Sequence, residues 1–324
     1  MSAPAQLESG QILDLRRALL AWYDAHRRDL PWRRTRDPYC IWVSEIMLQQ
    51  TRVGAVLLHY RKFLQRFPTV QKLAAARESS VLGEWSGLGY YRRARHLHAA
   101  AKVIVRQGTG ESPRTAEQWR ELPGIGRYTA AAIASIAFDE AVAVVDGNVQ
   151  RVLRRVLGTA PQNSAMWQAA EELLDRIRPG DFNQAMMELG ATVCLPSDPR
   201  CAECPIRQFC RTQGRDAVKS GNSRQIKRAI AYSLTRRKGA VLLVQRNQDD
   251  RLMPGMWELP EVKSGNGDKR LFSLKHSITV TDFQVDVVAR KSRARGKWVR
   301  VSRLNSLPLT GLARKILRRA EIIQ

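Results

Sequence analysis

Two acidic residues of this chain follow or lie within apolar stretches, where a carboxyl group can act as an acid or stabilise a positive charge. We expect a helix to start at about Ser44, which places Glu45 in its first turn. A glutamate there is usually exposed and favoured by the helix dipole, whereas burial among its apolar neighbours would raise its pKa toward that of a useful acid. The sequence alone leaves both interpretations open. Asp146 directly follows the apolar run 141–145, which is an unusual place for a carboxylate.

The turn Leu122–Gly126 is a second feature with chemical potential. Its two glycines, Gly124 and Gly126, permit backbone conformations that a side chain would forbid. The Ala-rich run 128–138 predicts a helix directly after the turn. A glycine turn that opens onto a helix N-terminus presents unpaired backbone N–H groups, which form a site for a phosphate. An ordinary helix–turn–helix would show the same pattern, so this signal alone is weak.

Four of the five cysteines fall close together, with six, two and five residues between them. A disulfide framework is not expected in an intracellular chain, so the spacing indicates a metal site. Four thiolates suit tetrahedral zinc or an iron–sulfur cluster, and the spacing alone does not separate the two. The candidate ligands are Cys194, Cys201, Cys204 and Cys210.

The turn Leu122–Gly126, followed about twenty residues later by Val-Asp-Gly-Asn at 145–148, resembles the helix–hairpin–helix DNA glycosylases. The resemblance implies that Leu122, Gly124 and Gly126 grip a DNA phosphate. Members of that superfamily that also nick the strand carry a lysine at the position of Tyr128, and its amine forms a Schiff base with the sugar. Tyrosine cannot form that adduct. The resemblance therefore implies a monofunctional glycosylase, which removes a base with water and leaves the backbone intact.

The segment 44–51, Ser-Glu-Ile-Met-Leu-Gln-Gln-Thr, is similar to a motif of the MutY-type adenine DNA glycosylases. In that family the residue matching Glu45 is the acid, and the side carrying Leu48 and Gln50 enters the DNA duplex. The other roles implied by this resemblance are catalysis by Asp146, Tyr128 and Asn148, contact with adenine by Trp32, Arg33 and Gln184, and insertion between bases by Tyr90.

The resemblance extends to the cysteines. Their spacing after the run 182–190, Phe-Asn-Gln-Ala-Met-Met-Glu-Leu-Gly, is similar to the [4Fe–4S] loop of the same glycosylases, which implies a cluster bound by all four. Other segments have two interpretations each. Segments 27–33 and 85–95 combine arginines with aromatic residues, which suits DNA contacts but equally an ordinary surface loop or turn. The arginines Arg151, Arg154 and Arg155 form a basic helical face that is either solvated or directed at phosphates.

Charge indicates the class of partner. The 324 residues include 54 Lys+Arg and 30 Asp+Glu, for a formal net charge of +24. Most of the excess lies in the last third, which indicates a polyanion: nucleic acid first, an anionic membrane surface second. The sequence has neither an apolar run near the ~20 residues of a membrane span nor a signal peptide. We expect an intracellular, cytoplasmic or nucleoid-associated monomer.

The length suits two domains. We expect a mainly α architecture with a helical catalytic domain at 1–215, a linker at 216–228 and a smaller α/β domain at 229–324, whose β-like runs include 231–235 and 277–288. The segment 252–260 resembles the Nudix-like domain of MutY proteins, which reads the damaged base opposite adenine. The glutamate-rich metal box of a Nudix hydrolase is absent from the sequence. At the expected reading tip, 278–280, only Thr279 offers a hydroxyl group.

Together these observations predict hydrolysis of the N-glycosidic bond of adenine mispaired with 8-oxoguanine or guanine in double-stranded DNA. The base would be flipped out of the duplex, protonated by Glu45 and replaced by water while Asp146 stabilises the sugar. Two alternatives are a thymine glycosylase acting on G·T mismatches and a non-enzymatic DNA-binding protein with a structural cluster. The second would leave the pair Glu45 and Asp146 without a purpose.

Overall fold

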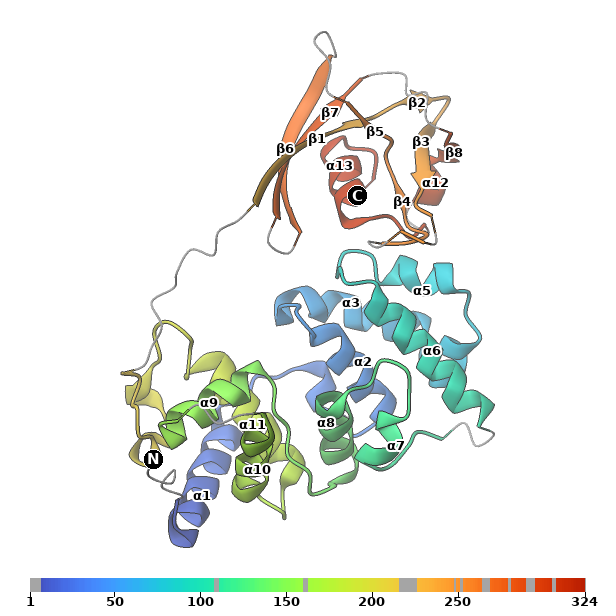
Figure 1. The fold of residues 1–324 in the computed structure, drawn as a ribbon. Helices are drawn as coiled ribbons and strands as arrows, with labels where there is room; N and C mark the ends of the chain where they lie inside the picture. The colour runs from blue at the N-terminus through green and yellow to red at the C-terminus, as the bar shows by residue number, and fades with distance from the viewer. Residues whose placement is uncertain are drawn as a thin grey trace. The chain divides into compact units, whose positions relative to one another are not determined.

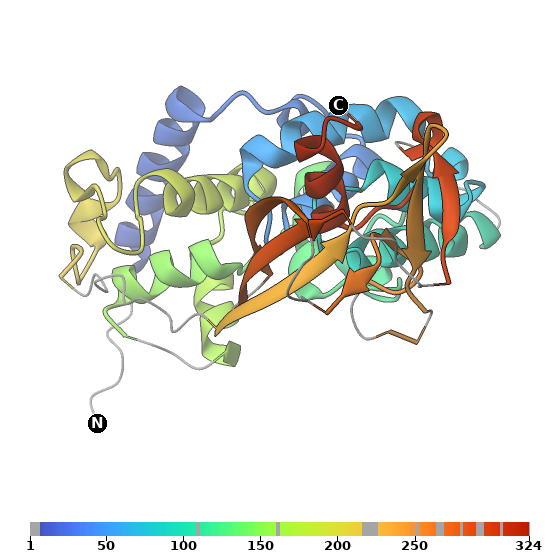
Figure 2. The same ribbon diagram turned by 90° about the horizontal axis from the view of Figure 1, so that it is seen from above.

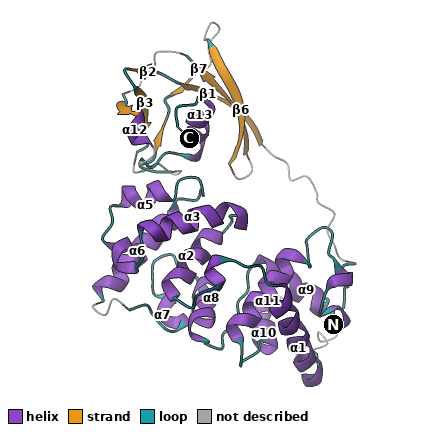
Figure 3. Ribbon diagram, turned by 180° about the vertical axis from the view of Figure 1, so that it is seen from behind, coloured by secondary structure: helices purple, strands orange, loops and turns teal. Residues whose placement is uncertain are grey.

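The computed structural model describes residues 7–107, 111–159, 163–215, 226–247, 249–250, 253–263, 269–278, 281–289, 295–304 and 307–323. The chain divides into two compact units, each built from two separate stretches of sequence. Residues 1–50 with 103–221 form the first unit, and residues 51–102 with 222–324 form the second. Within the described residues, all strands follow residue 225 (Figure 3), and none of the helices there is long and apolar enough to cross a membrane.

The first unit is a helical bundle (Figure 1). Residues Thr129–Ile136 of the Ala-rich helix α8 are all buried, so other helices surround it, among them α2, α7 and α11. Such burial on every side is typical of a central helix. The elements are α1 (Ser9–His26), η1 (Pro31–Arg33), α2 (Pro38–Leu48), α7 (Ala116–Arg120), α8 (Arg127–Phe138), α9 (Gly147–Leu157), α10 (Asn163–Leu173), α11 (Pro179–Thr192), η2 (Cys201–Glu203) and η3 (Arg207–Phe209).

Helix α2 begins at Pro38, well before the predicted start at Ser44. The carboxylate of Asp37 accepts hydrogen bonds from the backbone N–H groups of Tyr39 at 2.8 Å and Cys40 at 3.4 Å, and Pro38 occupies the first helical position, where its missing N–H is not needed. The predicted start is wrong because Asp-Pro, a typical loop signal, here caps a helix. Glu45 consequently lies inside the helix and not in its first turn.

The second unit joins four helices that follow residue 50 to the C-terminal strands, which are accompanied by two further helices. One sheet has the strand order β5-β1-β7-β6, and a second has the order β2-β3-β4 with β8 also paired to β3. Strand β1 runs parallel to β7, while β6 and β7 form an antiparallel hairpin. The elements are α3 (Val53–Arg66), α4 (Val70–Ala74), α5 (Glu78–Glu84), α6 (Arg92–Arg106), β1 (Ile226–Ser233), β2 (Arg236–Arg237), β3 (Ala240–Gln245), β4 (Trp257–Glu258), β5 (Glu261–Val262), β6 (Arg270–Ile278), β7 (Thr281–Val288), β8 (Lys297–Arg300), α12 (Val301–Leu304) and α13 (Gly311–Arg319).

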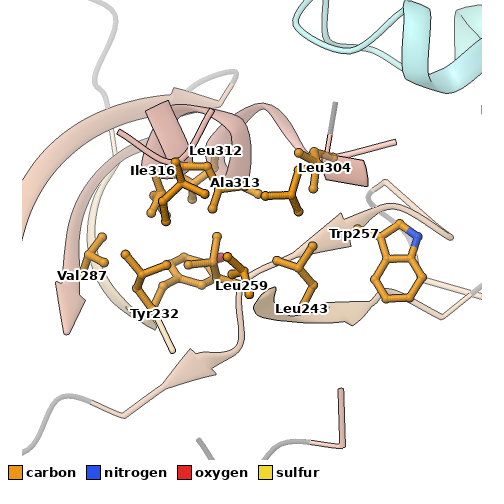
Figure 4. Close-up of a cluster of buried hydrophobic side chains, with 14 of the residues drawn as sticks. Tyr232, Leu243, Trp257, Leu259, Val287, Leu304, Leu312, Ala313 and Ile316 are labelled. Carbon is orange, nitrogen blue, oxygen red and sulfur yellow. The ribbon is translucent and has the colours of Figure 1, made fainter. Parts of the chain in front are cut away.

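Helix α13 packs against these strands and supplies much of the C-terminal core (Figures 2 and 4). Thr310 caps the helix, since its hydroxyl group accepts the N–H of Ala313 at 3.1 Å. The buried face repeats at helical spacing and consists of Leu312, Ala313, Ile316 and Leu317. Its neighbours in the core include Tyr232, Leu243, Leu259 and Val287.

The C-terminal strands confirm the predicted α/β character but shift its boundaries. Strand β1 begins at Ile226, inside the predicted linker 216–228, because the strand pairs with β7 along its whole length. The predicted run 277–288 is a hairpin, in which Ser277 pairs with Asp282. Thr279, the predicted lesion-reading residue, lies outside the described residues.

The compact units also differ from the predicted domains. Helices α3 to α6, up to residue 102, group with the C-terminal strands and not with the remaining helices. The division into a catalytic domain at 1–215 and a Nudix-like domain at 229–324 stays a prediction.

Candidate active site

Glu45 is the central residue of the site. It lies near the end of α2 and is only 6% exposed. Its Oε2 accepts a hydrogen bond of 2.7 Å from the hydroxyl group of Tyr128. Burial raises the pKa of Glu45 to about 7, opposed by the Tyr128 hydrogen bond and assisted by the charge of Asp146. A carboxyl group with such a pKa holds its proton near neutral pH, so Glu45 can act as a general acid.

Tyr128 stands in the first turn of α8, directly after the glycine turn. Burial and the negative charge of Glu45 raise the pKa of Tyr128 well above its ordinary value. The phenol therefore stays neutral and can donate to Glu45. Its hydroxyl oxygen also lies 3.3 Å from the sulfur of Met187, so a residue of α11 borders the same space.

Asp146 caps helix α9. Its Oδ1 accepts the backbone N–H of Val149 at 2.7 Å, and its Oδ2 accepts the side-chain amide of Asn148 at 3.0 Å. Both oxygens thus accept hydrogen bonds, and the side chain is fixed at the N-terminus of the helix. Because the charge of Asp146 also affects the pKa of Glu45 and Tyr128, the structure brings the four predicted catalytic residues together.

Asn183 on α11 fixes the extended segment that leads to Asp146. Its side chain is 2% exposed and its Oδ1 accepts the N–H of Val144 at 3.1 Å. Its amide nitrogen donates to Val142 O at 2.8 Å and to Ser135 Oγ at 2.9 Å. Two of these bonds satisfy backbone groups of a segment that belongs to no sheet, and the third ties Asn183 to α8. The position of the Asp146 carboxylate thus depends on a residue that the sequence analysis did not identify.

A second buried carboxylate, Glu188, is held by two arginines. It is 1% exposed, and it accepts hydrogen bonds from Arg28 Nε at 2.6 Å and from Arg33 Nη2 at 2.8 Å. Burial alone would raise the pKa of Glu188, but hydrogen bonds from Arg28 and Arg33 lower it to about 2. Arg33, predicted to contact a base, is therefore oriented by Glu188. The ion pair was not visible in the sequence because its partners are 155 residues apart.

The other two predicted base-pocket residues belong to the same surroundings. Trp32 is 6% exposed within η1, and Gln184 is half-buried on α11. Gln184 shares one face of α11 with Met187 and Glu188, since residues three and four apart lie above one another on a helix. That face borders both Tyr128 and Arg33, whose charge also reaches Glu45.

In the turn Leu122–Gly126 the structure bears out the prediction for Gly124 but not for Gly126, whose extended backbone (φ −91°) any residue can adopt. Leu122 and Ile125 are buried, and the N–H of Ile125 donates to the carbonyl of Leu122 at 3.2 Å. Gly124 has a φ of +77°, which a side chain would disfavour. In the described residues no side chain caps the N-terminus of α8 at Gly126, so that end of the helix remains able to bind an anion.

Two of the predicted duplex-contacting residues have left-handed backbones. Gln50 follows α2, is exposed and has a φ of +55°. Tyr90 precedes α6, is 46% exposed and has a φ of +47°. Leu48, the last residue of α2, is half-buried. An exposed tyrosine in such a conformation is a feature that folding alone does not favour.

The four cysteines line one small cavity of about 20 Å³. In the described chain no group of three or more His, Cys, Asp or Glu residues is arranged to hold a single metal ion. Arg155 borders the cavity, is 4% exposed, and donates to the carbonyls of Leu195 at 2.7 Å and Pro196 at 3.0 Å. Arg151 donates to the carbonyls of Gly190 and Cys194. Arg151 and Arg155 thus hold the cysteine loop, whereas Arg154, the third arginine of the predicted basic face, is exposed.

Comparison with known proteins places this architecture. Residues 43–179 match the model of the HhH-GPD superfamily of base excision DNA repair proteins. A solved structure of a thermostable thymine-DNA glycosylase is 32% identical, with an alignment that covers 64% of this chain and 98% of that one, at a TM-score of 0.59. The chain belongs to the HhH-GPD superfamily.

This HhH-GPD protein is also similar to adenine DNA glycosylases. The one from Rattus norvegicus is 52% identical over 215 residues, which cover 62% of this chain and 42% of the relative. The one from Arabidopsis thaliana is 40% identical over 299 residues, which cover 76% and 47% respectively. The chain spans less than half the length of these two relatives. The predicted resemblance to adenine DNA glycosylases is confirmed.

Proposed function

We propose that this HhH-GPD protein is a monofunctional adenine DNA glycosylase, which hydrolyses the N-glycosidic bond of adenine opposite 8-oxoguanine or guanine in duplex DNA. The observation that carries the proposal is the pair of carboxyl groups in different surroundings. Glu45 is buried with a pKa of about 7, while Asp146 accepts two hydrogen bonds at a helix N-terminus. The names of the rat and plant relatives support adenine as the base removed.

In the proposed reaction Glu45 protonates a ring nitrogen of the flipped adenine, because a neutral purine leaves more readily than its anion. Departure of the base leaves positive charge on the sugar, which the carboxylate of Asp146 stabilises until water adds. Asn148 and the backbone of Val149 keep Asp146 oriented. Tyr128 offers no amine for a Schiff base, so the DNA backbone remains intact.

Recognition follows from the surroundings of these carboxylates. Trp32, Arg33 and Gln184 would contact adenine, with Arg33 oriented by Glu188. A base inside a duplex is out of reach, so the enzyme flips it, while Leu48, Gln50 and Tyr90 would occupy the gap. The turn Leu122–Gly126 would hold a phosphate. The C-terminal α/β part would be a Nudix-like domain that reads the opposite base, with Thr279 as a contact. Double-stranded DNA would thus be the partner of an intracellular monomer.

The cysteine cavity fits an iron–sulfur cluster better than a single ion. Each of the four irons of a [4Fe–4S] cluster takes one thiolate, so the sulfurs can stand farther apart than around one metal ion. All four cysteines line one cavity although no three of the described candidates suit a single ion. Cys194, Cys201, Cys204 and Cys210 would therefore hold the cluster, which would shape the loop without entering the hydrolysis. Iron and sulfide analysis of the purified protein tests this assignment.

Single-turnover base release from four duplexes tests the proposed function. Adenine should be released opposite 8-oxoguanine and guanine, and adenine opposite thymine should remain. Strand breaks should appear only after alkali or heat, and borohydride should trap no adduct. Glu45→Gln should retain binding of the mispair but lose base release by a factor of about 10²–10⁴. Enzymatic strand breakage with a trapped adduct would refute the monofunctional assignment.

The solved thymine-DNA glycosylase favours one second candidate, thymine release from G·T mismatches. The fourth duplex, with thymine opposite guanine, decides between the two: release of thymine alone would move the protein to that activity. Binding without release from any duplex would indicate a non-enzymatic DNA-binding protein.

A further inference from the structure

The wedge loop, residues 86–91, carries Tyr90 between α5 and α6. Three of its residues have left-handed backbones, with φ of +111° at Gly87, +72° at Gly89 and +47° at Tyr90. This conformation is easy for glycine but strained for tyrosine. A strained residue persists only where its surroundings over-determine it. The contacts of the loop therefore show what keeps Tyr90 exposed.

One set of contacts comes from the neighbouring helical residues. The indole N–H of Trp85 donates to the carbonyl of Gly89 at 3.1 Å. Arg93 Nη2 donates to the carbonyls of Leu88 and Gly89, both at 3.3 Å. The Arg93 guanidinium also lies 5.5 Å from the centre of the Tyr90 ring, within the range of a cation–π contact.

A second set joins both ends of the wedge loop to one carbonyl group of the C-terminal segment, residues 309–314. Leu309 O accepts hydrogen bonds from Ser86 Oγ at 3.0 Å and from the hydroxyl group of Tyr91 at 3.1 Å. Arg314 of α13 donates through Nε to Ser86 Oγ at 2.9 Å. Ser86, Tyr91 and Leu309 are each at most 6% exposed. A carbonyl oxygen has two lone pairs, so both acceptor sites of Leu309 O are used.

Leu309 is itself fixed in the C-terminal core. Its side chain is fully buried among the cluster shown in Figure 4. Trp257 donates its N–H to the carbonyl of Pro308 and accepts the N–H of Thr310, both at 2.9 Å. The backbone on each side of Leu309 is thus bonded to β4, and α13 starts immediately after it. The anchor of the wedge loop is a rigid part of the sheet region.

We propose that the C-terminal segment positions the wedge: Ser86, Tyr91 and Arg314 hold Tyr90 in its inserting conformation through the carbonyl group of Leu309. These three are positioning residues, since they act through Tyr90; Ser86 and Tyr91 are buried and Arg314 is half-buried. The inference rests on the proposed function, because it assigns Tyr90 to the gap left by the flipped base. It makes the C-terminal part a determinant of base flipping in addition to any reading of the opposite base.

A double-mutant cycle on the full-length chain tests this proposal. Tyr91→Phe removes one hydroxyl group and keeps the ring, Tyr90→Ala removes the wedge, and the third variant combines both. Insertion is followed by the fluorescence of 2-aminopurine placed beside the mispaired adenine, in a Glu45→Gln background that leaves the base attached. Tyr91→Phe should lower the population of the inserted state about tenfold, the typical effect of one buried hydrogen bond. In the absence of Tyr90 the same change should have no further effect.

The proposal would be overturned if the losses of the two single variants added up in the combined variant, because Tyr91 would then act independently of Tyr90. Ser86→Ala should reproduce the effect of Tyr91→Phe and replaces it if that variant fails to fold. Tyr232→Phe, a buried tyrosine of the C-terminal core, is the matched control and should resemble the parent protein. If the parent gives no fluorescence change on any duplex, Tyr90 is not a wedge and the inference fails. If the protein with Glu45 intact releases no base while the fluorescence changes are as expected, only the proposed function is refuted.

Discussion

Two buried glutamates, Glu45 on α2 and Glu188 on α11, show how neighbouring cations decide the protonation state of a carboxyl group. Burial raises the pKa of Glu45 to about 7. Burial acts on Glu188 as well, but hydrogen bonds from Arg28 and Arg33 reduce its pKa to about 2. Near neutral pH the first can give up a proton and the second has none to give. The acid of the proposed reaction is therefore Glu45 alone.

Tyr128→Phe should shift the pH dependence of adenine release toward higher pH. The hydroxyl group of Tyr128 lowers the pKa of Glu45, so its removal raises that pKa. The protonated acid is the active form, and it is lost as pH rises through its pKa. The parent rate should fall above about pH 7, and the variant should fall at higher pH.

Single-turnover rates of base release across the pH range measure this shift. Tyr60→Phe, another buried tyrosine, is the control and should leave the profile unchanged. A decline that moves to lower pH in Tyr128→Phe would contradict the assignment of Glu45 as the acid. Because the pKa of Glu45 is raised in the folded protein, folding stability should also decline as pH rises toward about 7.

Among individual residues, those that belong to motifs could be identified from the sequence. Glu45, Tyr128 and Asp146 could be predicted because each stands in a recognisable segment, and the structure places them together. The contacts of each could not be predicted, since they depend on partners that are distant in the sequence. Glu188 controls Arg33 from 155 residues away, and a polar residue in an apolar helical run gives no indication of what it binds.

At the scale of elements, the close approach of α9 and α11 supports Asp146. A Cβ at Gly190 would lie 2.6 Å from the Cβ of Asn148, a distance that real side chains do not tolerate. The carbonyl group of Gly190 also accepts Arg151 Nη2 at 2.7 Å, while the same nitrogen donates to Asn148 Oδ1 at 2.9 Å. The glycine lets two helices meet where Asn148 must reach Asp146.

Gly190→Ala should therefore destabilise the protein and slow base release together. Overpacking of this kind costs about 1–3 kcal/mol, which chemical denaturation measures, and the displaced Asn148 no longer orients Asp146. Gly10→Ala in the exposed first turn of α1 is the control, because a Cβ there meets nothing within 4 Å. That variant should be neutral or more stable by up to about 1 kcal/mol. Equal stability of the two variants would show that α9 and α11 are not closely packed.

Element boundaries were predicted less well than element types. The helical and α/β parts follow from periodicity, whereas α2 starts at Pro38 because Asp37 finds two free N–H groups to cap. Strand β1 extends back to Ile226 because β7 supplies partners that local sequence does not contain. Both differences arise from hydrogen bonds, which a pattern of apolar residues does not encode.

For the whole molecule, the net charge of +24 predicts a strong dependence of DNA binding on salt. Neutralising several phosphates releases counterions, so affinity should fall about a thousandfold or more between about 50 and 200 mM salt. Mispaired and matched duplexes should show the same slope, because phosphate contacts carry no sequence information. Titrations of both duplexes at several salt concentrations measure the slopes. A slope near zero would contradict a phosphate-dominated interface.

The second unit is assembled from one stretch of the chain that is translated early and one that is translated late. Ser86 and Leu309 are 223 residues apart in the chain, and a ribosome adding roughly 5–20 residues per second needs roughly ten to forty-five seconds to cover that interval. Throughout that time the hydroxyl groups of Ser86 and Tyr91 lack the acceptor that they share in the folded protein, the carbonyl group of Leu309. The wedge loop is therefore translated early but completed late, because a chain that ends before Leu309 lacks both the acceptor of the loop and helix α13.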